Sequence, residues 1–300
     1  CSDIAIELHP SRSGWTEPNL HDHRLHCPTT SPTLVKVSQS GPHVEVWLRI
    51  VDPNWTRKLE PGKIDGMYEL TDYPLREGLI EAHEKVWENI AGPGPFWTGA
   101  ERIAMVAESR TATSCLLCAK RRQALSPYAV DGVHDSETDL DAVIIDMIHR
   151  IRSDPGRLTR NMFDQVMGAG ITPEQYIEIV GVVNSSVIID TLHAALGLPL
   201  AELPTPQPGA PTGQPPANVT EAGAWVPIAV GNERPGMING LSDNREPNIA
   251  RSMGLVPNAV QLFFTAFRPH YALQNIPLEL KQSQAEFIAS RVSALNQCFY

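Results

Sequence analysis

The sequence predicts a mainly helical fold, and two observations support this. Apolar residues recur at three- and four-residue intervals from Leu79 to Ile90, from Leu140 to Ile151 and again after Asn248, which is the spacing of one helix face. Residues that start and stop helices flank such runs, as Thr172-Pro173 and Gly197 do for the longest of them.

The first 74 residues (1-74) are expected to be a mostly poorly ordered N-terminal extension. Residues 1 to about 33 are rich in His, Pro, Ser and Thr and lack a sustained apolar period. Further on, Val44 to Ile50 alternates between apolar and polar residues, which predicts a short strand, and Leu34 to Val37 is placed to pair with it. Side chains that suit a transition metal also occur here, at His21, His23, His26 and Cys27. The interpretation favoured for them is a solvated, disordered segment.

Residues 75-198 are expected to form a first helical unit. Its first helix stops at Gly92-Pro93-Gly94-Pro95, and the second begins at Thr98, with Glu101 three residues later in a capping-box pattern. Further helices are predicted over Leu140–Ile151, over Thr159–Met167 and from Thr172 to about Leu196.

Residues 199-245 are expected to be an extended linker, because prolines crowd the stretch from Pro199 to Pro216. Helical periodicity returns in residues 246-300, which are expected to be a partial copy of the first unit. In the first unit, Ala100-Glu101 leads through a helix to Cys115, and in the second, Ala285-Glu286 leads in the same way to Cys298.

The amino-acid composition indicates which classes of partner the chain does not favour. Three hundred residues with a formal net charge of -10 and a pI near 5.5 show no basic excess of the kind that nucleic acid or an anionic membrane selects. We expect no apolar stretch as long as the roughly 18 to 20 residues that span a bilayer. The first residues of the chain lack the pattern of a signal peptide. We therefore expect no nucleic-acid partner, no membrane and a cytoplasmic location. Five cysteines, an odd number, favour reduced or catalytic thiols over a secreted disulfide framework.

The motif that carries chemistry is Cys115-Leu116-Leu117-Cys118. Two thiols at this spacing can close a disulfide across one helical turn, and the cations of Lys120-Arg121-Arg122 favour the reactive thiolate. The alternative is a structural pair, either buried thiols or half of a zinc site. Zinc normally takes four ligands, and the sequence shows no complete second C-x-x-C or nearby Cys-His pair. Thiol redox chemistry is therefore the main hypothesis.

Four segments of the chain resemble the alkylhydroperoxidase AhpD-like, carboxymuconolactone decarboxylase superfamily, and most closely its tandem alkylhydroperoxidase-related members. They are Phe96–Arg102, Ser114–Cys118, Tyr176–Val183 and Arg291–Cys298, and the likeness spans roughly Leu79 to Tyr300. The resemblance implies an all-α fold of tandem AhpD-like helical bundles, the second unit truncated, and assembly into a homo-oligomer.

The resemblance also implies roles for single residues. In the AhpD-type peroxidases, a Glu on the preceding helix, the C-x-x-C pair and a His four residues after the second Cys act together. By position, Cys118 would attack the peroxide, Cys115 would resolve the sulfenic acid as a disulfide, and Glu101 would be the acid. Two alternatives stay open: Glu101 only caps its helix, or Glu108, two helical turns before Cys115, is the acid instead.

One residue of the family pattern is missing. The position four after Cys118 is Arg122, which lowers a thiol pKa by its charge but stays protonated and cannot shuttle a proton. Either His134 folds back to substitute, or the unit has lost peroxidase turnover, and His134 is then a solvated loop residue. His149 and His193 lie on predicted helices and are interpreted as packing or surface residues.

The second unit keeps a shorter Glu-to-Cys spacing, from Glu286 to Cys298, and the chain stops at Tyr300, one residue before a second C-x-x-C would be completed. Three explanations are open: a selenocysteine codon taken as a stop, an ordinary truncation, and a rotated numbering.

The sequence thus predicts a thiol-dependent peroxidase-type oxidoreductase. Its expected partners are a peroxide substrate and an unknown thiol or protein reductant, and the chemistry requires no metal or organic cofactor. The alternatives are a non-redox enzyme of the carboxymuconolactone decarboxylase type and a catalytically inactive oligomeric relative.

Overall fold

The structure is a computed structural model. It describes residues 6–8, 34–38, 45–49, 67, 68, 71, 73–230, 248–271, 276 and 278–295. Contacts divide the chain into two compact units, residues 1–62 and residues 63–300.

The described residues of the first unit form a three-stranded antiparallel sheet in the order β1-β3-β2. The strands are β1 (Ile6–Leu8), β2 (Leu34–Ser38) and β3 (Glu45–Arg49). The pairing of β2 with β3 confirms the predicted hairpin, with Val35 opposite Leu48. β1 was not predicted and lies inside the segment expected to be poorly ordered. The histidines and Cys27 of that segment lie outside the described residues.

The second unit is mainly helical, as the sequence predicts. Its helices are α1 (Glu77–Ala91), α2 (Gly99–Thr111), α3 (Leu116–Gln123), α4 (Ala142–Ser153), α5 (Arg160–Gly168), α6 (Pro173–Leu196), α7 (Asn248–Met253), α8 (Pro257–Phe267) and α9 (Gln282–Leu295). Short 3-10 turns follow α3 and α4, at η2 (Pro127–Ala129) and η3 (Pro155–Arg157). One small strand pair, β4 (Val219–Thr220) with β5 (Ile228–Ala229), departs from an all-α fold.

Predicted helix ends are confirmed where the signal is local. Before α2, the Thr98 hydroxyl accepts the Glu101 N–H at 3.3 Å, and the Glu101 carboxylate accepts the Thr98 N–H at 2.8 Å. Thr172 and Gln175 form the same capping box before α6. Gly197 ends α6 with φ of +70°, a left-handed conformation that glycine adopts without strain.

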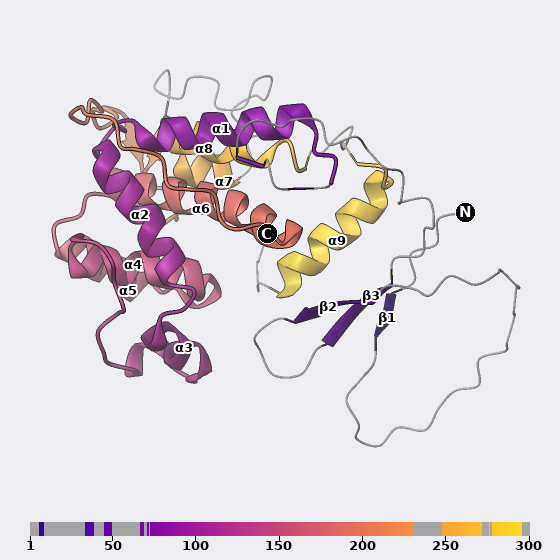
Figure 1. The fold of residues 1–300 in the computed structure, drawn as a ribbon. Helices are drawn as coiled ribbons and strands as arrows, with labels where there is room; N and C mark the ends of the chain where they lie inside the picture. The colour runs from indigo at the N-terminus through magenta and orange to yellow at the C-terminus, as the bar shows by residue number, and fades with distance from the viewer. Residues whose placement is uncertain are drawn as a thin grey trace, which may run out of the picture. The chain divides into compact units, whose positions relative to one another are not determined.

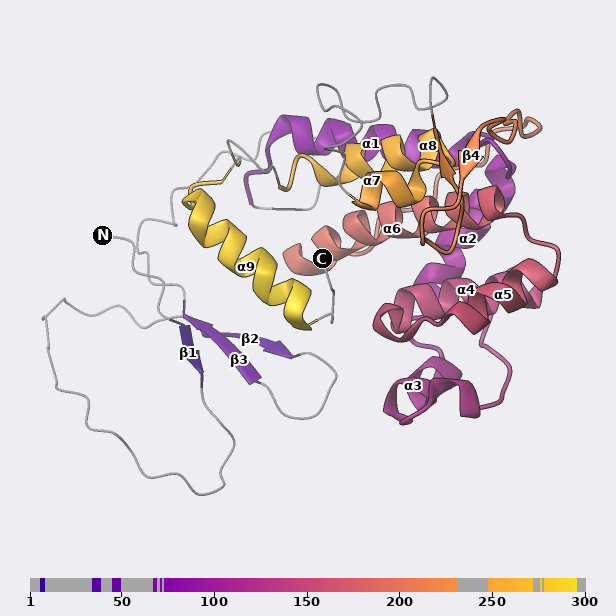
Figure 2. The same ribbon diagram turned by 180° about the vertical axis from the view of Figure 1, so that it is seen from behind.

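Helix α6 is the centre of the second unit and packs against α8, α2, α4 and α1 (Figures 1 and 2). Its crossing with α8 is close because Gly181 faces Ala259: a Cβ at Gly181 would lie 2.6 Å from the Ala259 Cβ. Among the described residues, α6 is also the one helix with the length and apolar composition to cross a membrane. This corrects the expectation that no such stretch exists. Its place among four other helices explains its apolar composition as that of a core helix.

The proline-rich segment does not separate two bodies. Described residues of this segment run along α1 and the turn before α2, where the Gln207 N–H donates to the Ala91 carbonyl at 2.8 Å and the Gly213 N–H to the Pro95 carbonyl at 2.7 Å. Beyond it, α8 buries its apolar face against α6 and α1. Residues 63–300 therefore form one compact unit, which differs from the expected division at 199-245. The interpretation of residues 246-300 as a partial copy stays a prediction.

Candidate thiol and histidine site

Both cysteines of the C-x-x-C motif lie at the start of α3. Cys115 is the N-cap residue, and Cys118 lies in the first helical turn. The Leu116 N–H, one of the free donors of that turn, is capped from outside by the Asp135 carboxylate at 2.8 Å. This contact holds the loop 130–141 over the start of α3. Cys115 and Cys118 are only 1% and 2% exposed, and they are free thiols.

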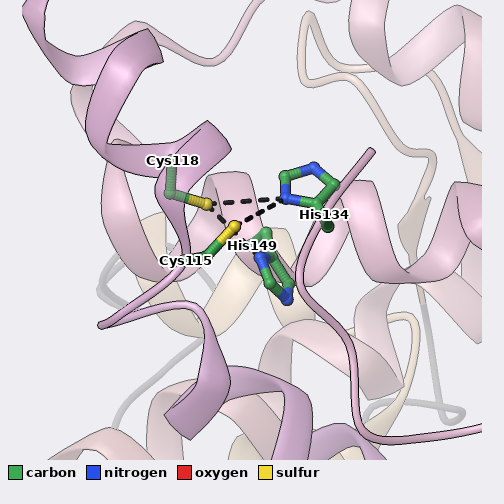
Figure 3. Close-up of side chains that lie close together, drawn as sticks. All are labelled: Cys115, Cys118, His134 and His149. Atoms are coloured by element: carbon green, nitrogen blue, oxygen red, sulfur yellow. Dashed lines mark hydrogen bonds between the residues drawn. The ribbon is translucent and has the colours of Figure 1, made fainter. Parts of the chain in front are cut away.

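The loop brings His134 to the thiols. Its Nδ1 lies 3.4 Å from the Cys115 Sγ and 3.6 Å from the Cys118 Sγ. Figure 3 shows the ring facing both sulfurs. Its Nε2 lies 2.9 Å from an Asp146 carboxylate oxygen on α4. Asp146 also accepts from Arg150 and pairs with Arg121. Of the two readings left open for His134, the geometry is that of a residue folded back onto the cysteines.

A second histidine, which the sequence interpretation assigned to packing or the surface, completes the cluster. The Nδ1 of His149, on α4, lies 3.3 Å from the Cys118 Sγ (Figure 3). His149 is therefore not a surface residue or a mere packing residue. Its ring is buried in contact with the Cys118 thiol. One sequence signal was present, because His149 lies four residues after Ile145, on the side of α4 that faces the interior.

The acid beside the cluster is Glu108 and not Glu101. Glu108 Oε2 lies 2.9 Å from His149 Nε2, whereas both described bonds of the Glu101 carboxylate go to Thr98. The reason is position along α2: Glu101 lies in its first turn, and Glu108 lies in its last turn, next to the cysteines. The structure thus favours the rival acid that the sequence left open.

Glu108 is held as an anion. Its Oε1 accepts from the Ser136 and Thr138 hydroxyls, each at 2.7 Å, and from the Glu137 N–H at 3.2 Å. Burial alone raises the pKa of this carboxyl, but these bonds and the His149 contact outweigh it and lower the pKa.

The cluster favours a thiolate beside charged imidazoles. Burial raises the pKa of Cys118, but contacts with His134, His149 and Ser153 outweigh it and lower the pKa to about 5. Burial lowers the pKa of His134, but Asp146 and the two thiols outweigh it and raise the pKa to about 10. The pKa of His149 is raised in the same way by Cys118 and Glu108, against the opposing effect of burial.

The other residues predicted for the site are not brought to it in the described part of the chain. Arg122 is exposed on α3. Glu286 lies on α9, where its carboxylate accepts a hydrogen bond from the Gln282 side chain at 2.6 Å. Its pKa is lowered mainly by a hydrogen bond from Tyr271 and to a smaller extent by the one from Gln282. Cys298 lies outside the described residues. The four clustered side chains therefore come from the first predicted unit alone.

Comparison of the chain with protein-family models, with curated proteins and with solved structures finds no match.

Proposed function

We propose that this chain is a thiol oxidoreductase that reduces a peroxide by cycling Cys115 and Cys118 between dithiol and disulfide. The observation that carries the proposal is the 3.3 Å contact between the Cys118 Sγ and the His149 Nδ1, with the Cys115 Sγ within 4.8 Å of both atoms. A nucleophile, a base that a carboxylate orients, and a second thiol are the parts that such a cycle needs.

The cycle balances with these groups. The Cys118 thiolate attacks one peroxide oxygen, the O–O bond breaks, and the alcohol or water that leaves takes a proton from a neighbouring imidazolium. Cys118 is now a sulfenic acid. The Cys115 sulfur attacks the Cys118 Sγ, the S–S bond forms, and the hydroxyl leaves as water. The dithiol has given two electrons, and two external thiols or one protein dithiol return them by exchange.

The two histidines have different roles in proton transfer. His149 reaches only Cys118 in the described contacts and is oriented by Glu108, so we assign it to the attacking thiol. His134 contacts both sulfurs, so as an imidazolium it is placed to give a proton to the departing oxygen. Once neutral, it can take the proton of Cys115 for the resolving step. Arg122 is not needed in this scheme, because His134 and His149 supply the transfer that an arginine cannot make.

Burial restricts the substrate. With both thiols almost closed to solvent, a small peroxide fits the site better than a bulky lipid peroxide. The large cavity between α1 and the proline-rich segment, near Trp87 and Pro204, is lined by none of the four clustered residues. The reductant must then reach the disulfide after movement of the loop 130–141, which covers the start of α3.

We also propose the protein family to which the chain belongs. We assign it to the tandem AhpD-like group, with homo-oligomeric assembly and a cytoplasmic location, on the four sequence segments that resemble that group. The non-redox enzyme and the inactive relative are the alternatives, and both predict that peroxide leaves the two thiols unlinked.

The test is peroxide treatment of the reduced, metal-free protein, followed by peptide mapping of the disulfide. We expect a Cys115–Cys118 bond that is absent in Cys118→Ser, and a trapped sulfenic acid on Cys118 in Cys115→Ser. Cys27→Ser is the matched control, because it removes a thiol outside the cluster and should leave the bond unchanged. Peroxide consumption that persists undiminished in Cys118→Ser would rule out the proposal.

A further inference from the structure

We infer that Cys115, Cys118, His134 and His149 form a Zn²⁺ site with two sulfur and two nitrogen ligands. This inference goes beyond the proposed function and does not depend on peroxide turnover. The C-x-x-C motif by itself offers only two ligands. The fold supplies two more, from the loop 130–141 and from α4.

The spacing of the donor atoms fits a tetrahedral ion. The two Sγ and two Nδ1 atoms all lie within 4.8 Å of one another. Zinc bonds of about 2.3 Å to sulfur and about 2.0–2.1 Å to nitrogen place a sulfur and a nitrogen about 3.6 Å apart on a tetrahedron edge. The three sulfur–nitrogen contacts in the cluster measure 3.3, 3.4 and 3.6 Å. These three edges therefore fit the ion with adjustments of a few tenths of an ångström, and the remaining donor pairs lie within 4.8 Å and close by about 1.5 Å at most.

The surrounding carboxylates fix the ring nitrogens that face the centre. A carboxylate accepts, so the Nε2 of His149 donates to Glu108 at 2.9 Å. The Nε2 of His134 donates to Asp146 at 2.9 Å in the same way. Arg121 Nη1 lies 3.0 Å from that nitrogen, but it donates to Asp146 itself. In the neutral rings, the Nδ1 lone pairs then point at the sulfurs. This carboxylate–histidine arrangement orients imidazoles at zinc sites and strengthens them as ligands.

The types of ligand favour zinc over other metal ions. The burial of the ligands favours a closed, structural site. Two thiolates with two imidazoles in a tetrahedral arrangement suit zinc, whereas oxygen ligands suit magnesium and calcium. Zinc sites that do catalysis keep one position for water, and structural sites are filled by four protein ligands. All four positions here come from the chain, and the two sulfurs are almost inaccessible. The ion would tie α3, the loop 130–141 and α4 together.

Zinc and the disulfide exclude each other, because both use the same two sulfurs. Oxidation of the bound form balances as two zinc-bound thiolates, one hydrogen peroxide and two protons giving one disulfide, free Zn²⁺ and two waters. Zinc occupancy would thus depend on the redox state of the cysteines.

The experiment is a titration of the reduced, metal-free protein with Zn²⁺ against a chromogenic chelator, and with Co²⁺ as a spectroscopic probe. The histidines at 21, 23 and 26 and Cys27 also offer ligands, so the titration is done in a full-length background that carries His21→Ala, His23→Ala, His26→Ala and Cys27→Ser. We expect one tightly bound ion per chain in this background. The cobalt form should show sulfur-to-cobalt charge transfer and the strong visible bands of a tetrahedral site.

His134→Ala removes one ligand and should remove tight binding. A second variant, Asp146→Asn, keeps the inference testable if a ligand variant fails to fold. It keeps all four ligands and should weaken zinc binding by about 10- to 100-fold, the usual effect of losing an outer carboxylate. A background protein without a tightly bound ion would overturn the inference. So would a cobalt spectrum without charge transfer from sulfur.

The result of the zinc titration can be distinguished from the result of the peroxide test of the proposed function. Zinc binding without a peroxide-dependent disulfide would support the site and reject the peroxidase. A disulfide in a protein that does not bind zinc would do the reverse.

Discussion

Glu108 and His149 meet through a 2.9 Å contact between Oε2 and Nε2, and both side chains are fully buried. They come from different helices, α2 and α4, so the packing of those helices sets the contact. A buried carboxylate that accepts four hydrogen bonds strongly favours its ionised form. It therefore fixes which way the His149 ring faces and which nitrogen meets Cys118.

Replacing Glu108 with Gln should slow peroxide-dependent disulfide formation by about 100-fold, the lower range of what a positioned acid or base contributes. The amide keeps the shape of the side chain but removes the charge that holds the His149 proton. Stopped-flow measurement of disulfide formation in metal-free protein gives the rate. Glu101→Gln is the matched control: it removes one charge from the same helix while keeping a capping-box residue, and its rate should equal that of the wild type. Equal slowing in both variants would contradict the assignment to Glu108.

Bound Zn²⁺ should protect the thiols. One equivalent of Zn²⁺ is expected to lower the rate of disulfide formation by at least about tenfold, because the sulfur lone pairs are engaged and the thiolate fraction controls attack. The measurement compares the rate with and without zinc, and then after chelator is added, when the original rate should return. Mg²⁺ at the same concentration is the control, since a site of sulfur and nitrogen ligands does not suit it. An unchanged rate with zinc shown to be bound would contradict this prediction.

Gly181→Ala should destabilise the protein. Alanine favours a helix over glycine by up to about 1 kcal/mol, but the new methyl would lie 2.6 Å from the Ala259 Cβ and 2.9 Å from its Cα. Overpacking of this kind costs typically about 1–3 kcal/mol, so the net free energy of unfolding should fall, by up to about 2 kcal/mol. Chemical denaturation measures it. Gly78→Ala in α1, with nothing within 4 Å of the new Cβ, should stabilise instead, and destabilisation of the same size in both variants would contradict the packing argument.

His83 should make the protein sensitive to acid. Its ring is fully buried, its Nδ1 contacts the Tyr68 hydroxyl, and its Nε2 lies 2.9 Å from His270 Nε2. Burial lowers the pKa of His83 to about 3, aided by the neighbouring His270 and His193 and opposed by a backbone bond to Ala266.

The sign of the effect follows from proton counts. Between about pH 6.5 and 3, the unfolded chain holds a proton at His83 that the folded chain does not. The free energy of unfolding should therefore fall as the pH drops below about 6.5, by up to about 1.4 kcal/mol per pH unit from this group. Denaturation of the wild type and of His83→Gln between about pH 5 and pH 7 tests this. His134 and His149 titrate identically in both proteins, so the variant should show a shallower decline, and parallel curves would contradict the prediction.

The features predicted correctly from sequence depend on neighbours in the chain. Thr98, Thr172 and Gly197 mark helix ends because capping groups act within three or four residues. The pairing of Cys115 with Cys118 is visible for the same reason. These signals gave the helical class and one half of the site.

The other half depends on packing between distant segments. Cys118 and His149 are far apart in sequence, and only the crossing of α3 and α4 brings them together. The choice of Glu108 over Glu101 depends on which end of α2 lies beside α4. Likewise, no local pattern shows that α8 packs on α6, and so the chain after the proline-rich segment was assigned to a separate unit.

The loop 130–141 contacts the site in three different ways. His134 faces the thiols, Asp135 caps α3, and Ser136 and Thr138 donate to Glu108. If the loop lifts, both sulfurs lose one imidazole while the anion behind the other imidazole becomes hydrated. The reactivity of the dithiol is therefore expected to switch as a whole with the opening of this single loop, so a reductant that binds there would act on a different electrostatic state from the one the peroxide meets.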